Sequence, residues 1–232
     1  MTQSPNSFVI AIDGPSGAGK GTVARAVSQA LGYRHLDTGA MYRAVAWKAL
    51  AMGLALDDEV GVADLARRAS LIAIDGVIVI DGDDVSRAIR SPGIDQAAAI
   101  VARLPSVREA LVRRQRQEGE RGGIVVEGRD IGTVVFPKAD VKLYLDATPE
   151  ERARRRATDP AHTNTTGAGV AEVAVALGAR DHLDRTRTMS PLARADDAVL
   201  VDTTGRSIDD VVREVMRIVA DRVKNRRHAG LP

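Results

Sequence analysis

Residues 8–22, FVIAIDGPSGAGKGT, constrain the fold more than any other part of the chain. The apolar run at residues 8–12 predicts a buried strand, and a helical pattern starts directly after the glycine-rich turn. Between them stands G-x-x-x-x-G-K, from Gly14 to Lys20, which is the spacing of a phosphate-binding loop between a strand and a helix. Glycines there let backbone N–H groups face phosphate oxygens, while the helix directs its positive end at them. We therefore predict a nucleotide phosphate site in which Lys20 supplies a full charge.

The loop departs from the common form at one position. Gly21 follows the lysine, and the first hydroxyl comes one residue later, at Thr22. In many such loops the residue directly after the lysine ligates Mg²⁺ through its hydroxyl. We therefore expect no metal ligand from the protein here, and Mg²⁺ held mainly through nucleotide phosphates and water.

Composition narrows the class of protein. A chain of 232 residues with 44% hydrophobic residues is long enough for one substantial α/β domain. The absence of cysteine excludes disulfides and thiolate metal sites. The polar start, MTQSPNS, lacks the regions of a signal peptide, and no apolar run approaches the ~20 residues of a membrane span. With a net charge of only +2, we expect a cytoplasmic protein that binds neither membrane nor nucleic acid.

Buried strands and helices alternate along most of the chain. Short apolar runs predict strands at residues 8–12, 33–36, 124–126, 141–147 and 198–204, with helical patterns between them. This alternation is typical of a parallel sheet with helices on both faces. The exception is LIAI-Asp75-Gly76-VIVI, in which Asp-Gly between β-branched runs predicts a tight hairpin. We interpret this hairpin as an insert and not as part of the central parallel sheet.

Turn and capping residues predict several helix boundaries. We expect Ser91-Pro92-Gly93 to form a loop and Pro105 to interrupt a helix between residues 97 and 118. Thr148 and Glu151 have the spacing of a capping box around Pro149. Ser207 is expected to cap a closing helix that runs to Val223, followed by a basic frayed tail.

Charged residues gather where predicted strands end and on two later helices. Glu127, Arg129 and Asp130 follow a buried strand, and ligands of open α/β sheets bind at that end. Arg152, Arg155 and Arg156 share one helix face beside the polar loop 157–169, which suits a lid that closes over phosphates. Arg180, Asp184 and Arg187 line one face of the next helix. A solvated basic helix and a surface salt-bridge ladder are the alternatives, and Arg43 could equally be a solvated helix charge.

The motifs together resemble the bacterial cytidylate kinases, members of the nucleoside monophosphate kinases, in which G-K-G-T is a usual form of the loop. The matching stretches, in order over nearly the whole chain, are IDGPSGAGKGT, LDTGAMYRA, DGDDVSRAIR, PSVREALVRRQR, VEGRDIGTVVFP, LYLDATPEERARRR and RDHLDRTRTMSPL. The resemblance implies a P-loop kinase with a five-stranded parallel sheet, a small antiparallel insert that binds the monophosphate, and a short lid. In this chain the core would be residues 1–60, 106–147 and 170–232, the insert about 61–105, and the lid about 148–169.

The resemblance also implies transfer of the γ-phosphate of ATP to CMP or dCMP, with Mg²⁺, by a monomer. ATP would bind to Gly14, Pro15, Ser16, Gly17, Ala18, Gly19, Lys20, Gly21 and Thr22. CMP would bind to Thr38, Arg43, Arg108, Arg129, Asp130, Arg180, Asp184 and Arg187. The catalytic charges would be Lys20, Arg129, Arg187, Arg152 and Arg156, with Asp13 and Glu127 as local organisers.

Within this set the phosphate of CMP would be held by Arg43, Arg129 and Arg187, because guanidinium groups bind phosphate bidentately. Asp184 and Arg180 would contact the ribose. Asp130 would accept from the cytosine amino group, which uracil lacks, and Arg108 would donate to the ring. One segment of this chain departs from the family. Members of the family often carry serines before the P-x-V-R motif, whereas this chain has Ala99 and Ala102. The preference for CMP over UMP is therefore expected to be smaller than is usual in the family.

Two other classes of function stay open. A kinase of UMP or AMP would share the same loop. A nucleotide-dependent switch would also bind ATP, but would lack a second, arginine-rich site. Because the acceptor of a monophosphate kinase is already an anion, no strong general base is expected among the residues above.

Overall fold

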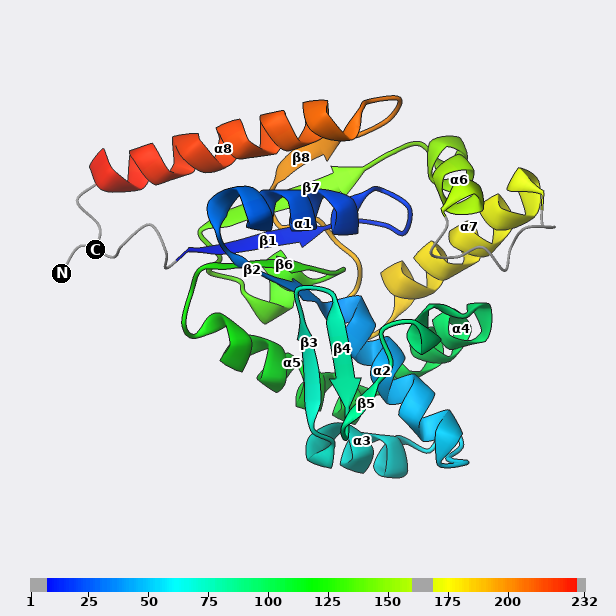
Figure 1. Ribbon diagram of the computed structural model, residues 1–232. Helices are drawn as coiled ribbons and strands as arrows, with labels where there is room; N and C mark the ends of the chain where they lie inside the picture. Colours follow the sequence, from blue (N-terminus) through cyan, green and yellow to red (C-terminus); the bar gives the residue numbers. More distant parts are fainter. Residues whose placement is uncertain (1–7, 160–168, 229–232) are drawn as a thin grey trace.

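The computed structural model describes residues 8–159 and 169–228. In this part of the chain one eight-stranded sheet has the order β5-β4-β3-β2-β6-β1-β7-β8 (Figure 1). Neighbouring strands are parallel from β2 to β8. These five strands are β2 (Arg34–Asp37), β6 (Ile124–Glu127), β1 (Val9–Asp13), β7 (Val141–Asp146) and β8 (Val199–Asp202). The prediction of a five-stranded parallel sheet is confirmed.

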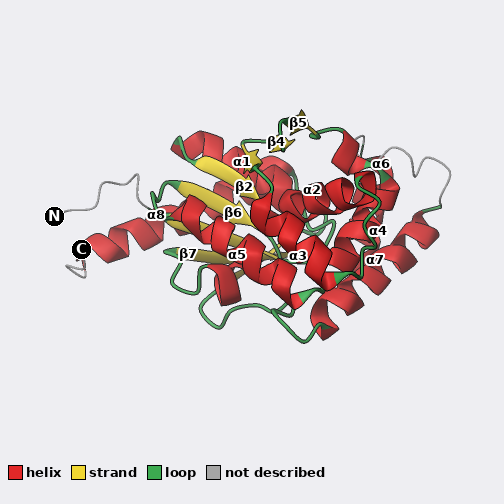
Figure 2. Cartoon of the chain, turned by 90° about the horizontal axis from the view of Figure 1, so that it is seen from below, coloured by secondary structure: helices red, strands yellow, loops and turns green. Residues whose placement is uncertain are grey.

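Alternation along the strands builds two apolar layers, one on each side of the sheet. Ile10 and Ile12 of β1 pack into one layer and Ala11 into the other, because successive side chains of a strand point to opposite faces. The first layer is closed by α1 (Lys20–Leu31) and α8 (Ile208–His228). The second is closed by α2 (Thr38–Ala51), α3 (Glu59–Arg68) and α5 (Pro105–Gly119), and α3 and α5 lie in front of the sheet in Figure 2.

The predicted hairpin is present as β3 (Leu71–Ile74) and β4 (Val77–Ile80). Asp75 and Gly76 both have positive φ, 54° and 83°, as a type I′ turn requires. A second Asp-Gly turn leads into β5 (Asp83–Asp84). β3 also pairs antiparallel with β2, so the hairpin extends the central sheet. The interpretation of the hairpin as separate from that sheet is wrong on this point, because the edge of β2 offers free backbone groups for pairing.

Proline begins two helices in this chain: this contradicts the predicted loop at residues 91–93 and agrees with the predicted break between two helices at Pro105. Residues 91–93 are not a loop: α4 (Pro92–Val101) follows a short helical turn, η2 (Ala88–Arg90), and Pro92 stands in its first turn. Pro105 likewise opens α5. The ring fixes φ at a helical value, and the N–H that proline lacks has no intrahelical partner at this position. A π-helical turn, η3 (Ile131–Val135), follows β6.

The last third of the chain departs from prediction in three details. In α6 (Pro149–Thr158), Thr148 caps Glu151 N–H, but the Glu151 carboxylate binds Arg154 and Arg155, so the capping box is half formed. β8 is an edge strand, and Leu200 is 49% exposed. After α7 (Val170–Thr186), α8 continues to His228, beyond the expected end at Val223. The predicted lid loop lies mostly outside the described residues.

No helix within residues 8–159 and 169–228 combines the length and the apolar character that a membrane crossing needs.

Gly14 ties the P-loop (residues 14–22) to the sheet and provides a test of the fold. A Cβ on Gly14 would stand 2.0 Å from the backbone carbonyl oxygen of Leu145 in β7, and φ is +145°. We expect Gly14→Ala to lower the free energy of unfolding by about 3 kcal/mol or more, because neither backbone can move away freely. Urea unfolding followed by circular dichroism measures this change.

The matched control is Gly178→Ala in the middle of α7, where a Cβ would meet nothing within 4 Å. This variant should stabilise the protein by roughly 0.5–1 kcal/mol, since alanine has the higher helix propensity. Equal effects of the two substitutions would contradict the close approach of the loop to β7.

Candidate functional site

A cavity of about 600 Å³ opens at the carboxyl ends of the parallel strands. The P-loop forms one wall, and the opposite wall is built from α2, α4 and α5. The segment after β6, the α6 arginines and the end of α7 complete it. Parallel strands all end at one edge, so loops distant in sequence meet there.

The P-loop has the backbone form that phosphate binding requires. Gly17 and Gly19 have φ of 80° and 86°, and α1 begins directly after them, at Lys20. The residues from Ser16 to Thr22 line the cavity, whereas Gly14 and Pro15 shape the loop from behind. The Lys20 ammonium donates to the carbonyl oxygen of Pro15 at 2.8 Å. The N–H groups of the first turn of α1 are thus available to an anion, with the helix dipole behind them.

Lys20 is 7% exposed. Burial lowers its pKa to about 7, and the nearby charge of Arg129 adds to this, while Glu127 and Asp13 act in the opposite direction. A lysine in this state holds its proton weakly until an anion arrives.

Asp13 organises the segment that follows β6. Its two carboxylate oxygens accept from the N–H groups of Ile131 and Gly132, both at 2.7 Å. Burial raises the pKa of Asp13 to about 6, even though these two hydrogen bonds favour the charged form. Asp13, the last residue of β1, therefore holds the backbone directly after Arg129 and Asp130 against the end of β1.

Arg129 and Arg187 share one carboxylate. The Asp184 carboxylate accepts from Arg129 Nε at 3.0 Å and lies 3.5 Å from Arg187 Nη1. Burial by itself would raise the pKa of Asp184, but Arg129, Arg187 and Arg180 together hold it below its usual value. Burial and the charge of Arg108 lower the pKa of Arg187. The cations at this end outnumber their local counter-charges.

Arg43 and Thr38 come from the first turns of α2. Asp37 caps this helix through Ala40 N–H and also accepts from Arg43 Nη2 at 2.8 Å. The hydroxyl of Thr38 donates to the carbonyl of Glu127 at 2.7 Å. Both residues line the cavity, so the cap that starts α2 also aims Arg43 into it.

Arg108 and Asp130 form a buried ion pair, and their residues are 3% and 6% exposed. Arg108 also lies over the ring of Tyr42, 5.6 Å from its centre. On the same wall, Ala98 and Ala99 of α4 and Ala102 directly after it line the cavity, and Arg108 Nη1 donates to the carbonyl of Ala102 at 3.3 Å. This end of the site therefore combines one carboxylate and one guanidinium with an apolar wall, a pattern suited to the edge and face of a small heterocycle.

Several donors in the cavity have no partner within the described protein. Arg43 Nε and Arg187 Nη2 are buried and make no hydrogen bond there. A buried guanidinium N–H without an acceptor is costly, so these atoms favour an anionic ligand. The structure thus brings together Arg43, Arg108, Arg129, Asp130, Arg180, Asp184 and Arg187 around one cavity, as the sequence predicts.

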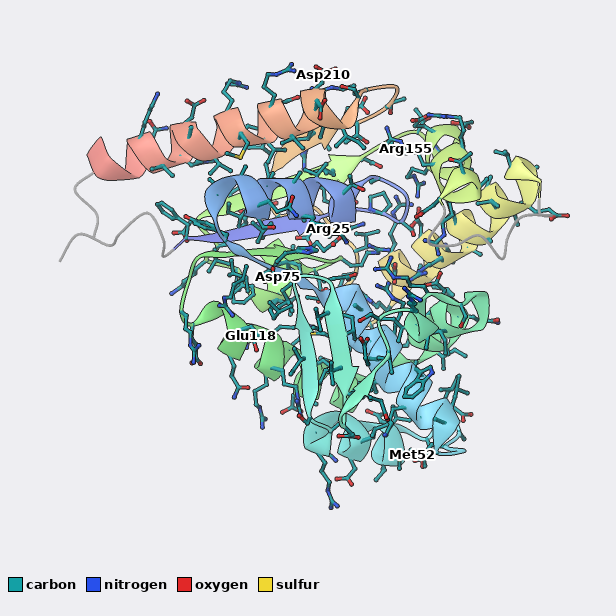
Figure 3. The ribbon with its side chains drawn as sticks, viewed as in Figure 1. Arg25, Met52, Asp75, Glu118, Arg155 and Asp210 are labelled. Carbon is teal, nitrogen blue, oxygen red and sulfur yellow. The ribbon has the colours of Figure 1, made fainter. Side chains whose placement is uncertain are left out.

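The three arginines of α6 that share one face have different surroundings. Arg152 is buried: it binds Asp181 and the carbonyl of Ser16 and does not line the cavity. Arg155 does line it, donates to Thr203, and lies near Gly19 (Figure 3). Arg156 also lines it and pairs with Asp95. In this conformation Arg152 braces the P-loop, while the other two face the site.

Sequence reasoning missed part of the site. Thr203, Arg206 and Ser207 line the cavity beside the P-loop, and Arg90 lines it as well. Arg155 is predicted only as a member of the arginine face of the lid. Thr203 and Ser207 follow the last parallel strand, so the rule that ligands bind at strand ends could have identified them. No such signal existed for Arg90, which lies in a short helical turn of the predicted insert.

Glu127 stands beside the P-loop and explains Gly21. Its carboxylate lies 3.0 Å from Nε2 of His35, and a Cβ on residue 21 would come within 3.1 Å of that carboxylate. Gly21 therefore leaves room for Glu127. Among the described residues, no three His, Cys, Asp or Glu side chains gather as a metal site.

Comparisons with known proteins agree with this geometry. The family described as "Cytidylate kinase" matches residues 10–221. The cytidylate kinase of Desulfitobacterium hafniense (strain Y51) is 46% identical over 93% of this chain and 94% of its own length. The cytidylate kinase of Solibacter usitatus (strain Ellin6076) is 46% identical over 94% of this chain and 95% of its own length. The structure of a gluconokinase from Sinorhizobium meliloti 1021 matches 97% of this chain and 98% of its own chain, with a TM-score of 0.50. At 16% sequence identity this similarity concerns the fold alone.

The pKa of Lys20 leads to a test of the P-loop. At about pH 8.5 the buried lysine of the free protein is mostly neutral, and bound phosphates raise its pKa, so ATP binding should take up about one proton. At about pH 6 the Lys20 ammonium is already charged in the free protein, so Lys20 should take up no proton when ATP binds. Calorimetry in buffers of different ionisation enthalpy measures the uptake.

Lys20→Arg is the matched control, because its guanidinium keeps its charge at both pH values. ATP binding to this variant should show no uptake at about pH 8.5. Equal uptake by the wild type and the variant would contradict the lowered pKa of Lys20.

Proposed function

Because the chain belongs to the cytidylate kinase family, we propose that it transfers the γ-phosphate of ATP to CMP or dCMP, giving ADP and CDP or dCDP. The observation that carries this proposal is the second half of the cavity. Opposite the P-loop, arginines with unpartnered N–H groups surround an acidic and apolar pocket. A protein that only bound or hydrolysed a nucleotide would need one anion site, whereas this cavity offers two.

The acceptor end divides naturally between the parts of a nucleoside monophosphate. Arg43, Arg129 and Arg187 are suited to the phosphate, since all three line the cavity and Arg43 Nε and Arg187 Nη2 have no acceptor among the described residues. Asp184 and Arg180 would contact the ribose hydroxyls. Asp130 with Arg108 faces the base, where a carboxylate accepts from the amino group of cytosine.

Catalysis rests on position and charge, because phosphoryl transfer needs little covalent chemistry from the protein. Lys20 and the P-loop N–H groups hold the donor phosphates. Arg129 and Arg187 would neutralise the acceptor and the transferring group, joined by Arg152 and Arg156 from the lid. Arg152 would have to leave Asp181 to reach the phosphates, so its part requires a rearrangement of α6.

Mg²⁺ fits this site through the nucleotide. Without a protein cage for a metal among the described residues, the ion would be held by phosphate oxygens and water, with the Glu127 carboxylate near enough to the loop to orient that water. The ion would supply further neutralisation of the donor phosphates.

Other parts of the proposal concern the whole protein. The division into core, insert (residues 61–105) and lid (148–169) is part of it, as are a monomeric state and a cytoplasmic location. Sedimentation equilibrium tests the monomer.

The acceptor assay tests the proposed reaction directly. With ATP as donor, we expect kcat/KM to be highest for CMP and dCMP and lower for UMP, because Asp130 cannot accept from uracil at that position. The alanines of α4 offer no side-chain hydroxyl to the base, so measurable UMP turnover is expected as well. A coupled assay of ADP release with CMP, dCMP, UMP and AMP measures these values. AMP as the best acceptor would refute the base assignment, and ATP binding without transfer to any of the four would favour a switch.

Lys20→Ala tests the role of the P-loop charge. Loss of a preorganised cation at the transferring group should lower kcat with CMP by about 10²–10³-fold. Lys48→Ala is the matched control, because Lys48 pairs with Asp81 and Asp83 on the surface of the predicted insert. Its kcat should stay within about twofold of wild type. Near-native turnover of Lys20→Ala would exclude the proposed role.

A further inference from the structure

Asp95 joins three elements that are distant in sequence. It stands in the first turn of α4, within the predicted insert. Its carboxylate pairs with Arg156 of α6 and lies 3.5 Å from Nη1 of Arg180 in α7. The three side chains are 15%, 20% and 23% exposed, so water screens them only in part. Figures 1 and 2 both show α4 beside α7, with α6 packed on α7.

The arginines around Asp95 repel one another. Burial lowers the pKa of Arg180, and the charges of Arg129 and Arg43 lower it further, whereas Asp95 and Asp184 act in the opposite direction. Asp95 also favours the charged form of Arg43. Asp184 belongs to the same helix as Arg180 and links that helix to Arg129 after β6, whereas Asp95 reaches Arg180 from α4. Of Asp95 and Asp184, only Asp95 brings a negative charge to Arg180 from another helix.

Both partners of Asp95 belong to the cavity, whereas Asp95 itself does not line it. Without this carboxylate the guanidinium groups of Arg156 and Arg180 would be free to turn into solvent, away from each other and from Arg129. A long side chain held in one rotamer before its ligand binds loses less entropy on binding. The same contact attaches the first turn of α4 to α6 and α7.

We propose that Asp95 is a positioning residue for phosphoryl transfer. It acts through Arg156 and Arg180, which it holds at the cavity wall between the insert and α6–α7 before the nucleotides bind. This inference rests on the proposed function and adds to it a residue outside the phosphate-binding set. It also accounts for an acidic side chain in a region where binding of two anionic nucleotides would otherwise favour positive charge.

Asp95→Asn removes the charge and keeps the shape, so it is the first test. We expect kcat with CMP to fall about fivefold, the effect of one partly buried ion pair, while KM for CMP changes less than about twofold. Asp95→Glu, which restores the carboxylate, should recover most of the loss. A smaller folded fraction would also lower the apparent kcat at unchanged KM, so kcat is taken per folded protein, with the folded fraction of each variant measured by urea unfolding.

A double-mutant cycle with Arg156→Gln shows whether Asp95 acts through that arginine. If it does, adding Asp95→Asn to the Arg156→Gln variant should lower kcat by less than about a further twofold. Asp64→Asn is the control: Asp64 lies on α3 of the insert, pairs with Arg67 and Arg68, and does not line the cavity. Its kcat should match wild type. Asp95→Ser, with a residue that helix starts tolerate, serves as a second variant should Asp95→Asn fold poorly.

Wild-type turnover of Asp95→Asn, no rescue by Asp95→Glu, or multiplicative losses in the cycle would overturn the inference. Absence of CMP phosphorylation by the wild-type protein would instead refute the proposed function. The two failures are therefore distinguishable in one series of assays.

Discussion

Positive charge concentrated at one edge of the sheet is the constraint on which the rest of the site depends. Lys20 and the arginines that line the cavity repel one another, and burial lowers the pKa of Lys20, Arg180 and Arg187. Several of these guanidinium groups are paired with a carboxylate from a different element, such as Asp184 for Arg129 or Asp130 for Arg108. These pairs hold the guanidinium groups in fixed directions and leave some N–H groups without acceptors. A bound phosphate can then accept from these N–H groups and neutralise the remaining positive charge.

The architecture makes this concentration of charge possible. Parallel strands end at one edge, and the Asp13 carboxylate fastens the segment after β6 to the end of β1. Gly14 allows the P-loop to pass against the backbone of β7. Each loop is thus supported by a neighbouring strand and not only by its own residues. Such support gives the preorganisation that phosphoryl transfer requires, since its rate depends on fixed positions and charges.

Several local features could be predicted because their causes lie within a few residues. The type I′ turn at Asp75-Gly76, the Asp37 cap and the strand–loop–helix at Gly14 are of this kind. The predictions failed where long-range contacts decided the outcome. The hairpin, for example, joined the central sheet because the edge of β2 lay open to β3. The capping box is a local exception, since Glu151 turned to Arg154 and Arg155 of its own helix.

For the site, the family resemblance gave the roles expected of the residues, and the pattern of residue types predicted that charged side chains gather at strand ends and on helix faces. It could not separate Arg152, buried against Asp181, from Arg155 and Arg156, which face the cavity, since all three share one helix face in the sequence. Nor could it predict that Asp95 meets Arg156 and Arg180. Periodicity specifies the face on which a residue lies, whereas the tertiary arrangement that brings the first turn of α4 to α6 and α7 decides which charges come into contact.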